Sequence, residues 1–419
     1  TVLTLDGDDA DDDAADTAAD AVPSGLSVPA RRDEVLPPVP TLDEAAATAA
    51  ASTADPADPA ALTLELLEWP RLSSHVASFA GTATCRAAMA AGLAVPTSRG
   101  ASEALLAETA EAHRLEGALA RTIDLRGFGD VSPLATLAGK GGVLTGEQLA
   151  TVERSLAAAA ALRKVVRGAA DDDPAALLTV LPALLDGVPV QAELRRAIGE
   201  AVDEGGSVRD SAEPTLGQLR FELRDVAAGA RRDLAALIQR KGDALASTSP
   251  IRRGDRFVLQ VIAKQKHRVP GVVRDVSASG QTLYVEPKEV EGTNTKLKTL
   301  AKREAAAERR VLAALSKRVG EPKVLAELRT LQAAVERIDA AAARARYARH
   351  VGARPVALCD PPRRCDDAEA AAVAAAAAEG CNVDGVSLRA LRHPLLVWRS
   401  PAEAPDASAV VPMDFRVPA

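Results

Sequence analysis

The chain has 419 residues, enough for two or three domains, and alanine, leucine and valine supply most of its apolar content. Alanine and leucine are strong helix formers, so this composition favours long helices over a β-sandwich or a β-barrel. Aromatic residues make up only 2% of the chain and are scattered, which argues against a base-stacking platform for single-stranded nucleic acid. The net charge of −7 is unevenly distributed along the sequence.

The four cysteines include no CxxC pair, and none pairs with a histidine at zinc-ligand spacing. We therefore expect neither a structural zinc site nor a disulfide framework, and a reducing compartment fits better. No run of about 18 apolar residues lacks charge, so no transmembrane helix and no membrane partner are expected. The compartment stays open: the cytoplasm if the protein is bacterial, a plastid or another organelle if it is algal.

The first 61 residues form an acidic segment rich in alanine and proline. Residues 1–62 contain fourteen Asp and Glu but only two Arg. Such a segment buries too little apolar surface to offset chain entropy, so we predict that residues 1–61 are disordered. A functional alternative is an acidic tail that competes with nucleic acid for the protein's own basic surface. The start at Thr1 instead of methionine suggests a fragment, a processed form or an incomplete gene model.

Residues 62–250 are predicted to form a helical core and a first long helical arm. Apolar residues recur there at three- and four-residue spacing, the period of an amphipathic helix. The first predicted helical segments are 62–92, 101–123 and 145–166.

Local signals within this region suggest where two further helices begin. Asp171–Asp173 followed by Pro174 is typical of a helix start. Thr215 with Gln218 fits a capping box. An apolar seam at helical spacing then continues to about Leu245, which predicts one long helix with charged residues on its other faces.

Within residues 251–290 the spacing of apolar residues changes from that of a helix to every second residue, the spacing of a strand. Phe257, Leu259 and Val261 fall on one face of a strand over Arg256–Ile262. Two more strands are predicted at Val272–Val276 and Thr282–Val285, with a turn between them at Ser277–Gly280. We therefore predict a small antiparallel meander, which forms a β-rich tip inserted between helices.

Helical periodicity resumes over residues 291–350, with an interruption at Glu321-Pro322. Two helical arms thus flank the β tip, and the predicted fold is mainly α, with long antiparallel helices. Within residues 351–419 the pattern changes to short strands at Pro355–Leu358, Val386–Leu391 and Val410–Val417. We expect these to be the first strands of an incomplete α/β domain, poorly ordered or loosely packed.

Residues 240–318 contain eighteen Lys and Arg against eight Asp and Glu, a balance of +10. A basic tip on long arms suits a grip on phosphates, because neutralising them releases condensed counterions whatever the base sequence. The segment Lys264–Arg268 is expected to be a loop without an acidic neighbour. The candidate contact residues are Arg252, Arg253, Arg256, Lys264, Lys266, His267, Arg268, Arg274, Ser277, Ser279, Gln281 and Lys288. The alternative is that these charges are a solvated face of helices and turns.

No catalytic, cofactor-binding or metal-binding residue is predicted. The phosphate-loop spacing GxxxxGK followed by Ser or Thr is absent, although Gly139-Lys140-Gly141-Gly142 resembles part of such a loop. The histidines lie far apart in the sequence and lack a partner pattern for a nucleophile or a metal ion.

The segments Arg252–Leu259 and Gly271–Pro287 resemble the clamp signature of the MutS-II branch of the MutS family. The similarity continues through Asn294 and the charged helix that follows. Further matching segments are Leu64–Leu67, Asp124–Gly127, Ala345–Ala348 and Leu391–Leu396. The resemblance covers about residues 62–419, and the clamp signature is its specific part.

This resemblance implies a homodimeric ATPase whose levers and clamp embrace nucleic acid, often with a C-terminal nuclease. It places residues 351–419 at the start of a truncated nucleotide-binding domain, so ATP and magnesium are implied only for the full-length protein. Members lack the Phe-x-Glu wedge of mismatch-reading relatives, and here no phenylalanine is followed two residues later by glutamate.

The partner that the resemblance implies is double-stranded or branched DNA, in recombination control or repair. One alternative is ribosomal RNA, bound by the same basic tip in translation quality control. Another is a non-enzymatic helical scaffold whose tip meets an acidic protein. Since DNA and ribosomal RNA both present phosphates, the sequence leaves these alternatives open.

Overall fold

The computed structural model describes residues 59–172, 178–356, 358, 385–398 and 410–418. Most of these residues are helical, which confirms the predicted mainly α class. The acidic segment lies outside the described residues except for its last three, which open a helix at Pro59. Among the helices described, none is long and apolar enough to cross a membrane.

A helical body precedes the first long arm. Its helices are α2 (Pro59–Leu66), α3 (Trp69–Ala77), α4 (Ala83–Ala91), α5 (Arg99–Glu116), α6 (Ser132–Gly139), α7 (Gly146–Asp172), α8 (Val180–Leu185) and α9 (Ala192–Ala201), followed by the 3-10 turn η2 (Asp210–Ala212). The main core is built largely of leucine, valine and alanine. Helix α12 (Pro322–Val351) contributes Leu331, Val335 and Ile338 to this core, so a distant part of the chain completes the body.

Of the two predicted helix starts, the one at Thr215 is confirmed without its capping box, and Asp173-Pro174 of the other lie outside the described residues. Asp171 and Asp172 end α7, because its apolar positions, from Leu149 to Ala169, continue to that point. Thr215 makes no side-chain cap to the helix that follows it. The capping box instead opens α7: the Thr145 amide donates to Gln148 Oε1 at 2.9 Å, and the Gln148 amide donates to Thr145 Oγ1 at 3.2 Å.

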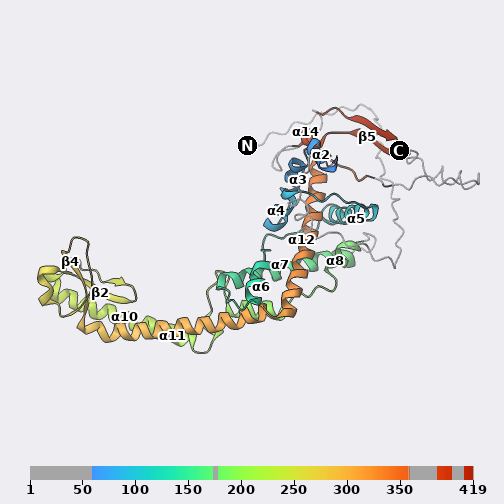
Figure 1. Cartoon of the computed structure of the whole chain (residues 1–419). Helices are drawn as coiled ribbons and strands as arrows, with labels where there is room; N and C mark the ends of the chain where they lie inside the picture. Colours follow the sequence, from blue (N-terminus) through green and yellow to red (C-terminus); the bar gives the residue numbers. More distant parts are fainter. Residues whose placement is uncertain (1–58, 173–177, 357, 359–384, 399–409, 419) are drawn as a thin grey trace, which may run out of the picture. The chain divides into compact units, whose positions relative to one another are not determined.

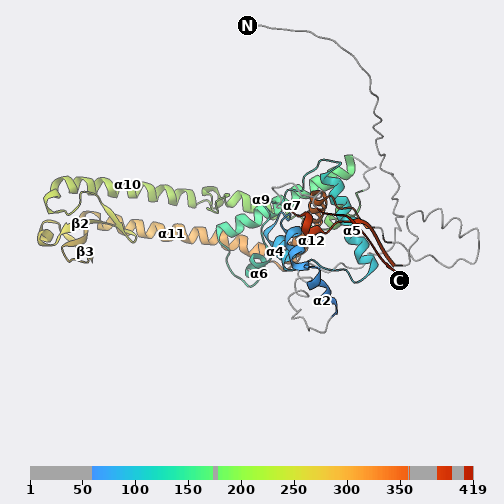
Figure 2. The same ribbon diagram turned by 90° about the horizontal axis from the view of Figure 1, so that it is seen from above.

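The two arms are helices α10 (Leu216–Lys241) and α11 (Lys288–Val319), which lie side by side and antiparallel (Figures 1 and 2). The predicted seam on α10 is confirmed as far as Leu237, but the helix ends at Lys241 and Leu245 instead bridges to Val261. The predicted interruption at Glu321-Pro322 separates α11 from α12.

The tip between the arms contains a four-stranded antiparallel sheet. Its elements are η3 (Gly242–Ala244), β1 (Ile251–Arg253), β2 (Arg256–Ile262), η4 (Ala263–Arg268), β3 (Gly271–Val276) and β4 (Thr282–Pro287). The strand order is β1-β2-β4-β3, so the predicted meander is wrong: β2 pairs with β4, and β3 takes the edge. Phe257, Leu259 and Val261 are buried against the arms, as predicted.

The tip and the body have separate hydrophobic cores that α11 joins. Val290 and Leu297, near the start of α11, pack in the tip core with Leu234 and Leu237 of α10. At the other end of α11, Leu315 and Val319 pack in the body core. The sheet is therefore fixed to one end of the paired helices and the body to the other.

The last described segments are β5 (Gly385–Leu391), α14 (Pro394–Val397) and β6 (Met413–Pro418). Strands β5 and β6 pair antiparallel, with Val386 49% and Phe415 46% exposed, so this ribbon buries little apolar surface. The predicted strand at Pro355–Leu358 is wrong, since residues 355, 356 and 358 are not in a strand.

Trp398, which follows α14, packs against helices α3 and α12. Its indole stacks on His75, with ring centroids 4.2 Å apart, and on Tyr347 at 5.8 Å. Burial and, to a lesser extent, Arg71 lower the pKa of His75. The segment from α14 to Trp398 is thus anchored on the body by an aromatic cluster.

Candidate nucleic-acid interface

Two tight turns shape the tip and set the positions of the candidate residues. Strands β1 and β2 are joined by Gly254 and Asp255, with Arg253 paired to Arg256 across the turn. Gly254 has φ +59°, which a two-residue hairpin turn requires and which glycine adopts without steric cost. Gly280, with φ +69°, takes the left-handed conformation in the longer connection between β3 and β4, where its amide donates to the Ser277 carbonyl at 2.8 Å.

A buried carboxylate on β4 organises the sheet. Glu286 has no solvent exposure and accepts hydrogen bonds from Arg256 Nη1 and Arg274 Nε, both at 2.5 Å. Arg274 reaches it from a β-bulge, since the register of β3 against β4 shifts between Val273 and Asp275. Both arginines are therefore paired with one buried carboxylate, so the group keeps a net positive charge, and we assign the two arginines a positioning role.

The hydrogen bonds around Glu286 keep this carboxyl ionised. Burial alone would raise its pKa, but the bonds from Asn294, Arg274 and Arg256 outweigh burial and hold the pKa below the usual glutamate value. A buried charge of this kind persists only with such partners, because an unpaired buried carboxylate costs several kcal/mol. The tip thus depends on one ionised glutamate.

Asn294 of α11 fastens the sheet to the arm. Its Nδ2 donates to the Phe257 carbonyl at 3.0 Å and to Glu286 Oε1 at 2.9 Å, and its Oδ1 accepts from the Phe257 amide at 2.9 Å. The pairing of β2 with β4 starts at Leu259 and Val285, which leaves Pro287 opposite Phe257. Proline has no N–H to donate, so the Asn294 amide replaces the missing strand partner.

The two arginines of β1 lie over aromatic rings. The Arg252 guanidinium is 5.9 Å from the centre of the Phe257 ring. That of Arg253 lies 4.4 Å from the centre of the Tyr284 ring, and it also pairs with Asp275 at 3.1 Å. Both arginines remain exposed. The cations cover these rings, so the rings offer little stacking surface to a base.

The segment Lys264–Arg268 is not the unpaired loop that the sequence suggested. It belongs to the 3-10 helix η4, which closes the connection from β2 to β3 with local i→i+3 bonds. Arg268 lies 3.6 Å from Asp243, and Lys266 donates to the Gly271 carbonyl at 3.2 Å. Lys264 and His267 are exposed, and neither has an ion-pair partner among the described residues.

The remaining candidates lie at two opposite ends of the sheet. Ser277, Ser279 and Gln281 surround the β3–β4 turn, and the Gln281 carbonyl accepts from the amide of Ala263 just before Lys264. Lys288 lies at the other end of β4, at the start of α11, and is exposed. A six-residue strand spans about 20 Å, so Lys264, beside the β3–β4 turn, and Lys288 lie about that far apart.

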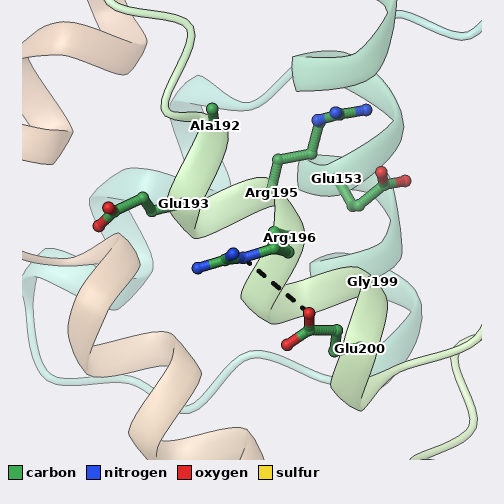
Figure 3. A pocket seen from close by; sticks show the side chains of 7 residues that line it. All are labelled: Glu153, Ala192, Glu193, Arg195, Arg196, Gly199 and Glu200. Atoms are coloured by element: carbon green, nitrogen blue, oxygen red, sulfur yellow. Dashed lines mark ion pairs between the residues drawn. The ribbon is translucent and has the colours of Figure 1, made fainter.

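A surface pocket between α7 and α9 offers no evident chemistry (Figure 3). Its lining residues are Glu153, Ala192, Glu193, Arg195, Arg196, Gly199 and Glu200. Arg196 and Glu200 are 3.9 Å apart, and both side chains are 72% exposed, so this pair is a solvated surface contact. In the part of the chain that the structure describes, no three His, Cys, Asp or Glu side chains gather as a metal site.

Several known proteins are similar to this chain in sequence. The chain is 36% identical to the Endonuclease MutS2 of Synechocystis over 357 residues. This alignment covers 85% of the chain and 40% of that protein. The corresponding values are 31% over 317 residues for the Endonuclease MutS2 of Thermomicrobium roseum, covering 75% and 36%. For that of Symbiobacterium thermophilum they are 36% over 287 residues, covering 67% and 34%.

The chain belongs to the MutS family. Within the family it is MutS2-like, which confirms the resemblance seen in the clamp signature. The chain spans about 40% or less of the length of these relatives. No model of a known protein family matches it.

Two organising residues of this MutS2-like tip were not among the predicted site residues. Glu286 alternates along β4 with the inward Val285, so period-two reasoning places it on the solvent side. Asn294 lies at a helical position that would suit an apolar side chain. Two signals pointed to Asn294: a polar residue at an apolar position of the helix, and its place in the stretch that resembles the MutS-II branch.

Proposed function

We propose that this MutS2-like chain is the lever-and-clamp part of its protein and that the tip grips double-stranded or branched DNA through phosphate contacts. One observation carries this proposal. Arg256 and Arg274 both have a buried ion-pair partner in Glu286, whereas the exposed Lys264 and Lys288 have no ion-pair partner within the described ranges. Charges that the fold leaves unpaired are the ones available to phosphates.

The arrangement favours contact with the backbone over reading of bases. Arginines cover the ring faces of Phe257 and Tyr284, while the β3–β4 turn offers the hydroxyl groups of Ser277 and Ser279 as phosphate donors. Lys264 and Lys288, about 20 Å apart, can contact separate phosphates of one duplex or of two arms of a branched DNA. The specificity proposed is therefore for shape and charge.

For the whole protein we propose the properties that the family resemblance implies: a homodimer with ATP and magnesium bound in the part of the relatives' length that this chain does not span. No step in the proposed grip depends on them. The tip's own residues position it through Glu286 and Asn294, and its exposed cations contact the phosphates.

The test is a salt titration of the full chain on a labelled four-way DNA junction and a matched duplex. The tip variant Lys264→Gln/Lys288→Gln removes two exposed charges, and Lys140→Gln/Lys164→Gln removes two exposed charges from the body as a matched control. Each lost phosphate contact lowers the slope of log K against log salt by about 0.9, so the tip variant is expected to lose nearly 2 and the control almost nothing.

Three results would decide against the proposal. Equal slopes for the tip and control variants would show that the tip makes no phosphate contact. Affinity for the junction that persists at high salt would refute a phosphate grip, because counterion-driven contacts weaken steeply with salt. Purified ribosomes and unlabelled junction can each be used to displace the labelled junction. If far less ribosome than unlabelled junction is needed, the function would move to ribosomal RNA.

A further inference from the structure

The exposed face of α11 is basic along most of its length. Between Gly292 and Val319, a fully described stretch, the exposed residues are only lysine, arginine, threonine, alanine and glycine. The basic members are Lys296, Lys302, Arg303, Arg309, Arg310 and Lys317. We call these six residues the α11 basic row. Small residues separate them, so a flat partner can approach the helix closely.

The acidic residues of this stretch face the other arm. Glu304 accepts a hydrogen bond from Arg220 Nε of α10 at 3.0 Å, and Glu308 accepts from Arg220 Nη2. Arg220 also donates to Asp210. The acids of α11 therefore fasten the two arms together. They are not available to neutralise the exposed basic side chains by the usual i,i+4 pairs.

The spacing of the α11 basic row keeps it on one side of the helix. Lys296, Arg303, Arg310 and Lys317 follow one another at exact seven-residue intervals, and Lys302 and Arg309 each precede one of them. Seven residues are nearly two turns and about 10.5 Å, so the row runs straight for about 30 Å. Arg310 pairs with Glu213; the other five have no ion-pair partner among the described residues.

Helix α10 has no comparable row, which separates this feature from an ordinary charged surface. Its exposed arginines, such as Arg224 and Arg232, alternate with the exposed Asp225 and Asp233. Mixed signs are typical of a solvated helix. The two paired helices therefore differ: the exposed charges of α10 are mixed in sign, whereas those of α11 between Gly292 and Val319 are all positive.

We propose that the α11 basic row binds the phosphate backbone of the same DNA duplex that the tip grips. This inference rests on the proposed function and extends its contact surface along the arm. Lys288, where α11 begins, and Lys317 are about 44 Å apart along the helix, which equals about 13 base pairs at 3.4 Å each. The footprint on DNA is then longer than the tip alone would give.

The test compares three variants of the full chain on a duplex of about 30 base pairs. The row variant is Lys302→Gln/Arg309→Gln, and its matched control on the other arm is Arg224→Gln/Arg232→Gln. Glutamine keeps the helix propensity of lysine and arginine, so both variants retain the helices. The third is the tip variant Lys264→Gln/Lys288→Gln.

We expect the row variant to lose about 2 from the salt slope and the α10 control much less. Equal losses in the row variant and the α10 control would overturn the inference, since the effect would then follow net charge alone. An unchanged row variant beside a weakened tip variant would overturn it while leaving the proposed function intact. A smaller salt slope in the row variant, together with an unchanged slope in the tip variant, would support DNA binding by the α11 basic row and refute the grip by the tip.

Discussion

Replacing Asn294 by alanine should loosen the tip without unfolding the body. The change leaves the Phe257 amide and carbonyl, both in a buried strand, without their partner and removes one donor from Glu286. An unsatisfied buried polar group costs about 1–3 kcal/mol, so the two backbone groups predict a loss of about 2–6 kcal/mol in tip stability. Thr295→Ala, at the next and exposed position, is the matched control and should cost less than about 0.5 kcal/mol.

Hydrogen exchange resolved by segment is the assay, because the tip and the body have separate cores. The β2 amides, including that of Phe257, should exchange much faster in the alanine variant. Both tryptophans, Trp69 and Trp398, lie outside the tip, so their fluorescence should show an unchanged urea midpoint for the body. Wild-type protection of β2 in Asn294→Ala would refute the role given to this side chain.

Three further predictions concern single positions. The pKa of Glu286 is lower in the folded state than its unfolded value of 4.5, so the ionised carboxylate stabilises the tip fully above pH 4.5. This stabilisation is lost as the pH falls through the lowered pKa. Hydrogen exchange of the tip, followed during acid titration, should show the loss in the wild type and not in Glu286→Gln. A Cβ at Gly320 would lie 2.4 Å from the Ala138 carbonyl oxygen, so Gly320→Ala should destabilise the corner between α11 and α12 by about 1–3 kcal/mol in urea unfolding. Thr145→Ala removes one half of the capping box with Gln148 and should cost about 1 kcal/mol in the same measurement, whereas an unchanged midpoint would contradict the cap.

Periodicity predicted the elements that local physical chemistry determines. The apolar face of β2 and the break at Glu321-Pro322 follow from side-chain alternation and from the backbone limits of proline. Capping at helix ends was harder to predict from the sequence. Thr145 and Thr215 are each followed three residues later by a glutamine, but only Thr145 and Gln148 form a capping box. Which one caps depends on the backbone angles that the surrounding packing imposes.

The sheet order and the polar network could not be predicted from local pattern. Strand order depends on which strands meet after η4 folds, and two strands adjacent in the sequence need not pair. Glu286 looks exposed by alternation, but Arg256, Arg274 and Asn294 come together from β2, β3 and α11 to enclose it. The sequence indicated which charges gather at the tip; the fold determined which of them stay unpaired.

The most direct test of the proposed grip is a contact measurement at the tip. A photocross-linkable amino acid placed at Gln281, an exposed and uncharged position in the β3–β4 turn, leaves the tip's charge unchanged. The same group at Thr330, exposed on α12 in the body, serves as the control. We predict that irradiation links DNA to the chain from position 281 and not from 330, and that the yield falls steeply as salt rises. Equal yields from both positions, or a yield at 281 that salt does not change, would contradict the phosphate grip.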